Sequence, residues 1–434
     1  MDFLIKITRV FVSIGPVGLI SVLFLFAGLI VSRNKLILLK NVAFTYLGLF
    51  AFSILMFFYI MFFNPIIGTI ISSSSKTFQV IDTGWFIAQK VDIYTPYTIF
   101  IFLFLIGINV LMLFLRLTRT INLDIWNLWI SLFSGVLVYE ITGVYWMGFL
   151  FSGVIATVTF VIADIYAPYL ENYYGIRGIS VPNPPTIIWT PIPNLINFLF
   201  NRIPFVRKIN IFYEEIQYKL GVVGEPMVIG FILGMIIGAV SKYKEFSYNL
   251  WPSILYSLFS GLYLAVIAVL MPRAISLLYR GIIPIIYDMK TFINSKFTKR
   301  EIYIGINPMI LAGNSSVIGL SAIMIPLTVY IATILPGNKM LPSADLVMIP
   351  LILIWAISLS RGDIFRSFIS AIIIIPIILL ISTNMTGFIT DFLTDDSGKQ
   401  IVKGFNNYSS MGMGSNLIYW VLIQIMQPIF KLFS

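Results

Sequence analysis

Residues 124–131 read DIWNLWIS and residues 363–370 read DIFRSFIS, so one short stretch of this chain occurs twice. Each copy follows an apolar run that ends in arginine, at Arg116 and Arg119 in the first case and at Arg361 in the second. Internal duplication in a strongly hydrophobic chain is typical of membrane transporters. The sequence therefore predicts two related halves.

Composition places the chain in a membrane. Of its 434 residues, 59% are hydrophobic and 11% are charged, whereas ordinary soluble domains carry about 25% charged residues. Crossing a bilayer core of roughly 30 Å takes about 20 helical residues. We predict an all-α polytopic membrane protein with apolar segments near 11–31, 43–70, 97–115, 125–145, 147–167, 225–241, 252–272, 309–335, 345–360, 366–383 and 415–433.

The basic residues indicate an orientation for these segments. Most of the 28 Lys and Arg residues fall in cytoplasmic segments if the N-terminus is outside and the C-terminus is cytoplasmic, as the positive-inside rule requires. Five spans in each half would invert the second half relative to the first. We expect about 11 transmembrane helices, with re-entrant hairpins. The predicted units are a first five-helix repeat (1–167), a Pro/Gly-rich connection (168–224), a second, inverted five-helix repeat (225–384), and an outer loop with the last helix (385–434).

Residue inventory limits the chemistry of the chain. It contains neither cysteine nor histidine, which excludes disulfides, thiolate nucleophiles and His-based proton shuttles. No Walker A motif, dinucleotide fingerprint or metal-ligand cluster is present, so we expect no cofactor and no metal. The net charge of +10 reflects membrane topology rather than nucleic-acid binding. The chain is predicted not to be an enzyme on its own.

Several segments have the composition of breaks between helices. The connection 168–224 contains six prolines between 182 and 204 and forms either a cytoplasmic linker or a re-entrant hairpin. Residues 305–316 and 335–338 combine Pro or Gly with asparagine, a pattern of turns. Residues 78–96, which include Asp82, Thr83 and Gly84, are too polar to span a membrane and too apolar for a free loop.

Acidic residues inside apolar segments require a reason, because each costs roughly 2.5–3.5 kcal/mol on insertion scales. Glu140 lies in the fourth segment and Glu225 directly precedes Pro226. Each could accept hydrogen bonds from substrate hydroxyls or carry a proton, or could have a purely structural role in an ion pair or a helix cap. Asp124 and Asp363 are interpreted as structural, paired with the neighbouring arginines, while Asn127 remains a possible ligand contact.

Four asparagines beside Pro or Gly suit an uncharged, polyhydroxylated ligand, because an amide offers both donor and acceptor. They are Asn183, Asn307, Asn314 and Asn338. The alternative is that they are ordinary loop amides. The tryptophans are interpreted as interfacial belt residues.

Specific motifs resemble one family. The stretch RLTRTINLDIWNLW at 116–129 is similar to the signature of the galactitol-type IIC components of the phosphoenolpyruvate-dependent phosphotransferase system (PTS), within the ascorbate–galactitol superfamily. The resemblance is collinear over nearly the whole chain. Further matching motifs are GEP at 224–226, MPR at 271–273, IGINP at 304–308, IPLT at 325–328, LPGNKMLP at 335–342 and RGDIFR at 361–366.

This resemblance implies a homodimeric permease in the cell membrane with separate scaffold and substrate-carrying core domains. It implies elevator-type import of galactitol or a related polyol, which a separate IIB protein then phosphorylates after receiving phosphate from a IIA protein. The implied substrate site comprises Asp82, Thr83, Gly84, Glu140, Asn183, Asn307 and the residues Pro336, Gly337 and Asn338.

Two alternatives remain open. Family members commonly carry histidine in the stretches that read 179–186 and 310–316 here, and aspartate where this chain has Asn307. A phosphotransfer-independent transporter or facilitator for a polyol or sugar is therefore the second hypothesis, with Glu140 and Glu225 as coupling residues. A non-transporting membrane scaffold or sensor is the third, and the intramembrane carboxylates argue against it.

Overall fold

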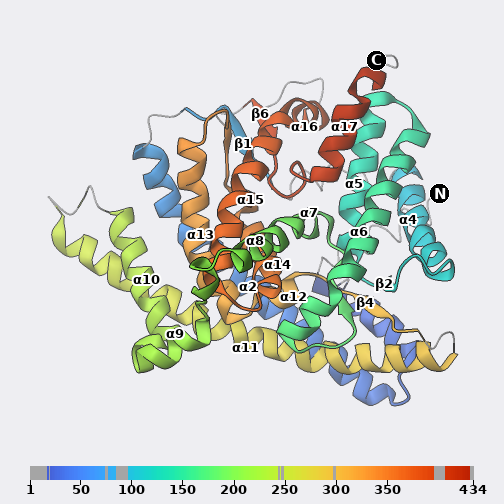
Figure 1. The fold of residues 1–434 in the computed structure, drawn as a ribbon, viewed down its shortest axis with the longest axis horizontal. Coiled ribbons are helices and arrows are strands. Elements are labelled where there is room, and N and C mark those ends of the chain that lie inside the picture. The colour runs from blue at the N-terminus through green and yellow to red at the C-terminus, as the bar shows by residue number, and fades with distance from the viewer. Residues whose placement is uncertain are drawn as a thin grey trace.

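Long apolar helices make up most of the structure. The computed structural model describes residues 17–18, 20–73, 77–84, 96–242, 245, 249–296, 300–394 and 406–430. Within these residues, seven helices are long and apolar enough to cross a membrane, in agreement with the predicted class. They lie in α2 (Lys35–Ser73), α4 (Pro96–Phe114), α5 (Ile125–Thr142), α6 (Tyr145–Tyr174), α11 (Leu250–Lys296), α13 (Ser315–Ile334) and α15 (Ile364–Asn384) (Figure 1).

The other predicted spans are shorter or bent. Helix α9 (Tyr213–Leu220) with the 3-10 turn η2 (Gly221–Gly224) meets α10 (Pro226–Ser241) at 78°, and this pair adds an eighth candidate span. Three further apolar helices have 10–17 residues, namely Ile20–Val31, Ala344–Leu359 and Leu417–Gln427. Each predicted segment therefore contains helix, but eleven full crossings remain a prediction.

The C-terminal helix differs from its prediction. Helix α17 (Leu417–Phe430) has 14 described residues, about 21 Å at 1.5 Å per residue, short of a bilayer core of roughly 30 Å. Figure 1 shows its C-terminal end on the same side as β1 (Val80–Asp82) and β6 (Asn407–Ser409). The described residues do not form the full last crossing on which a cytoplasmic C-terminus depends. Residues 1–16 lie outside the described part of the chain.

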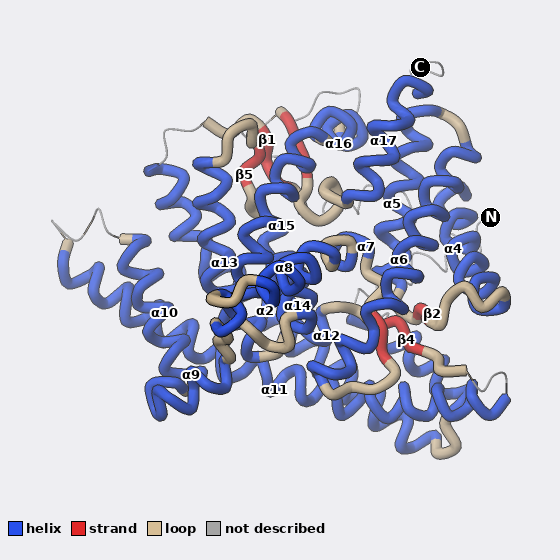
Figure 2. Tube along the Cα trace, viewed as in Figure 1, coloured by secondary structure: helices blue, strands red, loops and turns tan. Residues whose placement is uncertain are grey.

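Two small sheets cross-link distant parts of the chain. One has the order β5-β1-β6 and the other β2-β4-β3, and every strand pair is parallel. The all-α prediction missed them, because strands of two or three residues leave no period-2 pattern. Figure 2 shows the two sheets well apart. The remaining strands are β2 (Thr120–Asn122), β3 (Ile179–Ser180), β4 (Tyr303–Gly305) and β5 (Met340–Leu341).

The repeated sequence forms the same local structure twice. Asp124 caps α5 and Asp363 caps α15, each accepting a bond from the backbone two residues on. The preceding helices, α4 and α14 (Met348–Leu359), are each followed two residues later by an arginine in the left-handed region, Arg116 at φ 62° and Arg361 at φ 54°. Glycine is the usual residue at such an end. The duplication therefore extends to backbone conformation.

The long helices α2 and α11 pack with their backbones nearly touching. A Cβ atom added at Gly48 would lie 2.5 Å from the backbone nitrogen of Leu278. One added at Gly281 would lie 2.4 Å from the carbonyl oxygen of Asn41. Helix α10 lies along α11 in turn. These three helices form one group, and the other helices pack mainly on one another, as α4, α5 and α6 do and as α13, α14 and α15 do (Figure 1).

The proline-rich connection turns into the protein interior. After β3, residues 181–190 are all buried and include the short helix α7 (Pro184–Ile187). Trp189 is among the largest fully buried side chains. Helix α8 (Pro191–Arg202) then leads to a more exposed stretch before α9. The first part of this connection is therefore buried in the protein, and α12 (Met309–Ala312) forms a similarly short helix after β4.

Candidate functional site

A cavity of about 440 Å³ lies between α2 and the turns that follow the strands of the second sheet. On the α2 side its wall is mostly apolar, with Ser53 as a polar exception. On the other side lie Trp126, Asn183 and Asn307, from α5 and from the turns before α7 and α12. Ligand pockets typically enclose about 300–1,000 Å³ and carry few polar groups. This cavity fits that description.

Strand direction explains why the polar groups meet there. In a parallel sheet the carboxyl ends of the strands share one edge. Asp124 follows β2, Asn183 follows β3 and Asn307 follows β4, each within three residues of the strand end. Proline fixes the backbone after both asparagines, at Pro184 and Pro308. Three distant segments are thereby brought to one side of the cavity.

A continuous set of hydrogen bonds joins these residues, which we call the amide network: Asn122, Asp124, Asn127, Asn183 and Asn307. Asn183 donates from Nδ2 to Oδ1 of Asn127 at 3.2 Å. Asn127 donates to Oδ1 of Asn122 at 3.0 Å and to the carbonyl that precedes Asn307 at 3.2 Å. Asn307 donates to Oδ2 of Asp124 at 2.8 Å. The network therefore fixes the orientation of both cavity-lining amides.

Both lining amides keep hydrogen-bonding capacity. Among the described residues, Asn183 donates once and its Oδ1 accepts from Thr186 at 2.9 Å. Asn307 donates once and its Oδ1 accepts from the Met309 nitrogen at 2.9 Å. An amide has two N–H donors and two lone pairs on its oxygen. Each can therefore still donate to and accept from a hydroxyl.

The electrostatics suit a neutral ligand. The residues lining the cavity include no lysine, arginine, aspartate or glutamate within the described part of the chain. The nearest carboxylate of the network, Asp124, is 4% exposed and is engaged by Asn307 and by the backbone nitrogen of Trp126 at 3.2 Å. Burying a charged ligand without a partner would be costly. The site is better suited to hydroxyls over an apolar wall.

Comparison with known proteins gives the family. Residues 10–399 match the family model described as the PTS system sugar-specific permease component, EIIC-GAT. The chain belongs to this family. It is 33% identical over 352 residues to the PTS system galactitol-specific EIIC component of Escherichia coli strain K12, covering 81% of this chain and 75% of that protein. The same figures apply to the protein of that name from Escherichia coli O157:H7.

One set of predicted site residues lies elsewhere in this permease, around the first sheet. The carboxylate of Asp82 accepts from the nitrogens of Gly84 at 3.1 Å and Asp345 at 2.7 Å. The Thr83 hydroxyl donates to the Ser409 carbonyl at 3.2 Å. Gly84 has φ 58°, and a Cβ there would lie 2.7 Å from that of Ala344. These contacts hold β1 against its neighbours, away from the cavity.

The predicted turn at 336–338 belongs to the same structure. Asn338 is 2% exposed and donates to the carbonyls of Ala332 and Met340, both at 2.9 Å. Its Oδ1 accepts from the Thr383 hydroxyl at 3.0 Å. Pro336 and Gly337 are exposed. Asn338 therefore connects α13 to β5 and α15, and its amide does not line the cavity.

Three further predicted residues also lie away from the cavity. Asn314 caps α13, accepting from the Ser316 nitrogen at 3.0 Å. Glu140 is exposed near the end of α5, not deep within a span as predicted, because α5 ends at Thr142. Glu225 is exposed at the start of α10, where its side chain makes no capping bond. Of the predicted residues, the structure brings Asn183 and Asn307 to the cavity.

Sequence reasoning missed Asp124 as part of the site. It predicted ion pairs between Asp124 and Arg116 or Arg119, and this was wrong. Strand β2 separates them, since five extended residues span about 16 Å, so Arg119 instead approaches Glu301 at 4.0 Å. The sequence signal that could have identified Asp124 is its position. Like Asn307, it follows the end of a strand and lies within one of the motifs that resemble the family. Ser53 carries no such signal.

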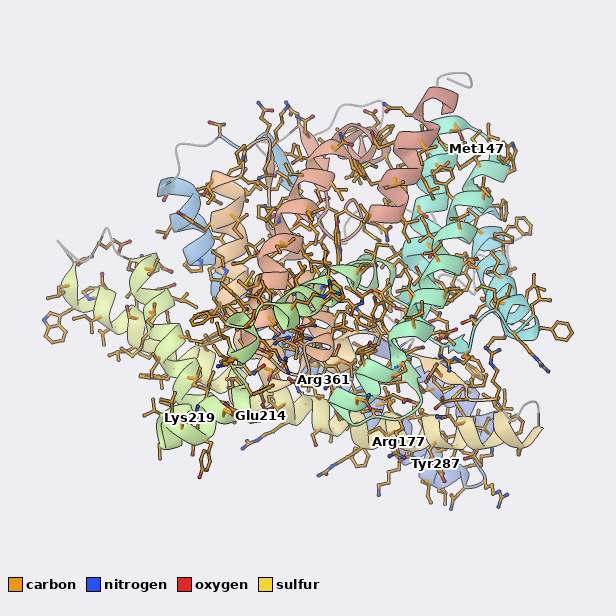
Figure 3. All side chains as sticks on the ribbon, viewed as in Figure 1. Met147, Arg177, Glu214, Lys219, Tyr287 and Arg361 are labelled. Carbon is orange, nitrogen blue, oxygen red and sulfur yellow. The ribbon has the colours of Figure 1, made fainter. Side chains whose placement is uncertain are left out.

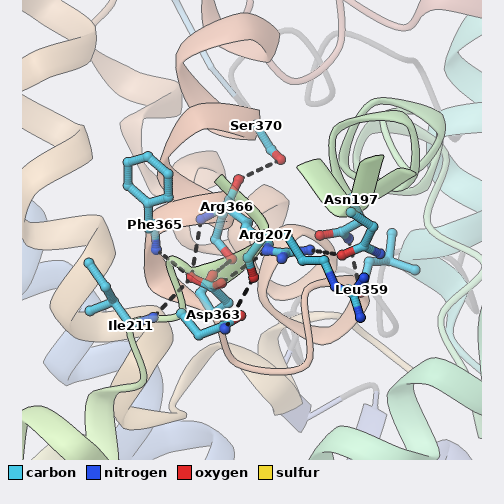
Figure 4. A network of polar contacts seen from close by, with 11 residues as sticks. Asn197, Arg207, Ile211, Leu359, Asp363, Phe365, Arg366 and Ser370 are labelled. Atoms are coloured by element: carbon cyan, nitrogen blue, oxygen red, sulfur yellow. Dashed lines mark hydrogen bonds and ion pairs between the residues drawn. The ribbon is translucent and has the colours of Figure 1, made fainter. Parts of the chain in front are cut away.

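The corresponding prediction for the second copy was right. Arg366 Nε lies 3.1 Å from Asp363 Oδ2, and both side chains are nearly buried. Arg366 also donates to Asn201 Oδ1 at 2.8 Å, and Asp363 Oδ1 accepts from the Phe365 nitrogen at 2.9 Å. Figure 4 shows this cluster where α8, α15 and the stretch around Ile211 meet. The pair fixes the start of α15.

Proposed function

We propose that this permease imports galactitol or a related polyol as the IIC subunit of a phosphotransferase system. The observation that carries the proposal is the pair of lining amides, Asn183 and Asn307, held by the buried network behind them. Fixed amides can bracket hydroxyls, and the apolar wall of α2 can cover the carbon chain. Family membership supports the transport role.

Phosphorylation would depend on partner proteins. The chain contains no cysteine or histidine to carry a phosphoryl group, so separate IIA and IIB proteins would supply it. The galactitol-specific relatives support a polyol as the substrate. The product would be a polyol phosphate released on the cytoplasmic side.

The architecture supports an alternating mechanism of the elevator kind between two inverted halves. In each sheet the central strand is the first after a long helix, β1 after α2 and β4 after α11. The cavity lies between α2 and the turns of the second sheet, so movement of one group past the other would carry the ligand. A homodimer joined through scaffold helices completes the proposal.

Uptake of labelled polyol tests the function. Cells that express the chain together with IIA and IIB should accumulate galactitol, mannitol or sorbitol as the phosphate ester, and only when phosphoenolpyruvate is supplied. Accumulation of the unmodified polyol without IIA and IIB would instead identify a phosphotransfer-independent transporter. Failure to bind or move any of the three polyols would refute both.

A further inference from the structure

The amino-terminal edge of the second sheet carries a group of basic residues that the polyol site does not use. Because its strands are parallel, the segments that lead into β2, β3 and β4 share one edge, opposite the amide network. We call the basic residues gathered there and beside it the basic rim: Arg116, Arg119, Arg177, Lys290, Arg300 and Arg361.

Contacts tie these residues to one place. Arg300 Nη1 donates to the carbonyl of Arg116 at 3.0 Å. The Arg119 guanidinium lies 5.0 Å from the ring centre of Tyr303, the first residue of β4. The side chain of Lys290 packs against Gly178, next to Arg177. The segments that lead into the three strands and the end of α11 therefore present their cations together.

A packing contact with the end of α6 places Arg361 near the same region. Gly362 lies against the ring of Tyr173, since a Cβ there would be 2.9 Å from Tyr173 Cε2. Tyr173 is the next-to-last residue of α6, and Arg177 follows that helix after the left-handed Gly175. Figure 3 shows Arg361 and Arg177 on the lower side of the molecule, with Lys219 farther to the left.

Backbone strain indicates that two of these arginines are needed where they stand. Arg116 and Arg361 adopt φ 62° and φ 54° at the ends of α4 and α14. Glycine adopts this conformation without cost, whereas other residues lose roughly 1 kcal/mol or more. Both arginines are exposed. General attraction to anionic lipid could be met at unstrained positions, so the strain favours a partner that recognises fixed positions.

Cations outnumber acids at the basic rim. The acidic residues beside it are Glu171, Asp288 and Glu301, together with Asp164, whose Oδ2 accepts from the Arg119 nitrogen at 2.7 Å. Six cations therefore face four acids, and the rim has a net positive charge. The amide network lies at the opposite edge of the same sheet, about 10 Å away, because a strand of three residues has that length.

We propose that the basic rim is the docking surface for the phosphorylated IIB protein, through the phosphoryl group and the acidic residues around it. This rests on the proposed function above. The rim residues all lie in segments predicted to be cytoplasmic, where such a donor would approach. Arginine suits the purpose because its planar fork binds phosphate and carboxylate in two-point contacts.

Replacing the strained arginines by glycine tests the proposal without endangering the fold. In Arg116→Gly/Arg361→Gly both cations are lost while the left-handed backbone is relieved. We expect the melting temperature to stay the same or rise and galactitol binding to be unchanged. The KM for phosphorylated IIB in polyol phosphate formation should rise roughly five- to tenfold, because surface charges mainly set association rates. Arg177→Glu should act in the same direction.

Lys219→Glu is the matched control, since it reverses an exposed charge on α9, away from the rim (Figure 3). It should leave the KM for IIB unchanged. Unaltered KM in the rim variants would overturn docking at this surface. A KM change that appears only in vesicles containing phosphatidylglycerol would show that the rim binds anionic lipid, and this result would also overturn the docking proposal. If the unsubstituted chain forms no polyol phosphate with IIA and IIB, the proposed function fails first and the docking proposal falls with it.

Discussion

Asn307 joins the buried part of the site to its open part. Its Nδ2 donates to Asp124 at 2.8 Å, its Oδ1 accepts from the start of α12, and its side chain lines the cavity. A hydroxyl bound there would contact the amide directly and would be influenced by the charge of the carboxylate behind the amide. Asparagine at this position thus links ligand contact to the alignment of β2 and β4.

Replacing Asn307 should therefore impair binding and stability together. In Asn307→Ala the Asp124 carboxylate loses a buried donor, which costs about 1–3 kcal/mol. We expect the Kd for galactitol to rise at least tenfold in equilibrium binding with labelled ligand. Asn314→Ala is the matched control, because it removes a helix cap worth about 1 kcal/mol but lies away from the cavity. Equal loss of affinity in both variants would contradict this site.

Part of this residue-level picture could be predicted from sequence. Asn183 and Asn307 stood out because proline beside a polar residue marks a break in an apolar run. Asp82 and Asn338 have the same signature but stabilise the first sheet, and sequence cannot separate the two uses without knowing which edge faces a cavity. The prediction that Glu140 lies inside a span failed because a shift of a few residues at a helix end decides whether a side chain is buried.

At the scale of elements, the start of α15 depends on one buried ion pair. Asp363 and Arg366 lie 3.1 Å apart with side chains 2% and 9% exposed. Removing one partner leaves an uncompensated buried charge, which typically costs about 3–5 kcal/mol. Asp363→Ala should therefore lower the melting temperature in detergent more than Asp363→Ala/Arg366→Leu does. A double variant that is destabilised at least as much as Asp363→Ala alone would contradict this role of the pair.

The contact of α2 with α11 depends on glycine. A methyl group at Gly281 would meet the Thr45 nitrogen at 2.4 Å, so the helices would have to separate. We expect Gly281→Ala to cost about 1–3 kcal/mol, as overpacking usually does, measured by thermal unfolding. Gly68→Ala is the control within α2, because nothing lies within 4 Å of its Cβ position. A Gly281→Ala variant as stable as Gly68→Ala would contradict the close packing.

Helices were predictable and strands were not, for a physical reason. Apolar runs of about 20 residues specify membrane helices by composition alone. The strands owe their pairing to segments far apart in sequence, such as β1 with β5 and β6. Those pairings decide where Asp124, Asn183 and Asn307 meet. The helical framework could thus be read from sequence, whereas the assembly of the site could not.

At the scale of the whole molecule, both sheets join the two halves of the chain. Each central strand is followed along the chain by an edge strand of the other sheet. In the first half β1 is followed by α4 and then β2, and in the second half β4 is followed by α12, α13 and then β5. The sequence repeat at 124–131 and 363–370 indicated this relationship, but it could not indicate that one sheet would border the cavity and the other would not. The cavity lies between α2 and the turns that follow the second sheet, and this arrangement is known only from the structure.

The claim that this cavity is the polyol site has a direct test. The chain contains no cysteine, so Ser53→Cys places a single thiol on the α2 wall of the cavity. Ser72→Cys places one at an exposed position near the end of the same helix. The rate of alkylation by a small maleimide is measured with and without saturating galactitol, mannitol or sorbitol. We expect at least one polyol to slow labelling of the Ser53→Cys variant and to leave labelling of Ser72→Cys unchanged. Equal labelling of Ser53→Cys with and without a polyol that the unsubstituted protein binds would contradict the assignment of this cavity as the polyol site.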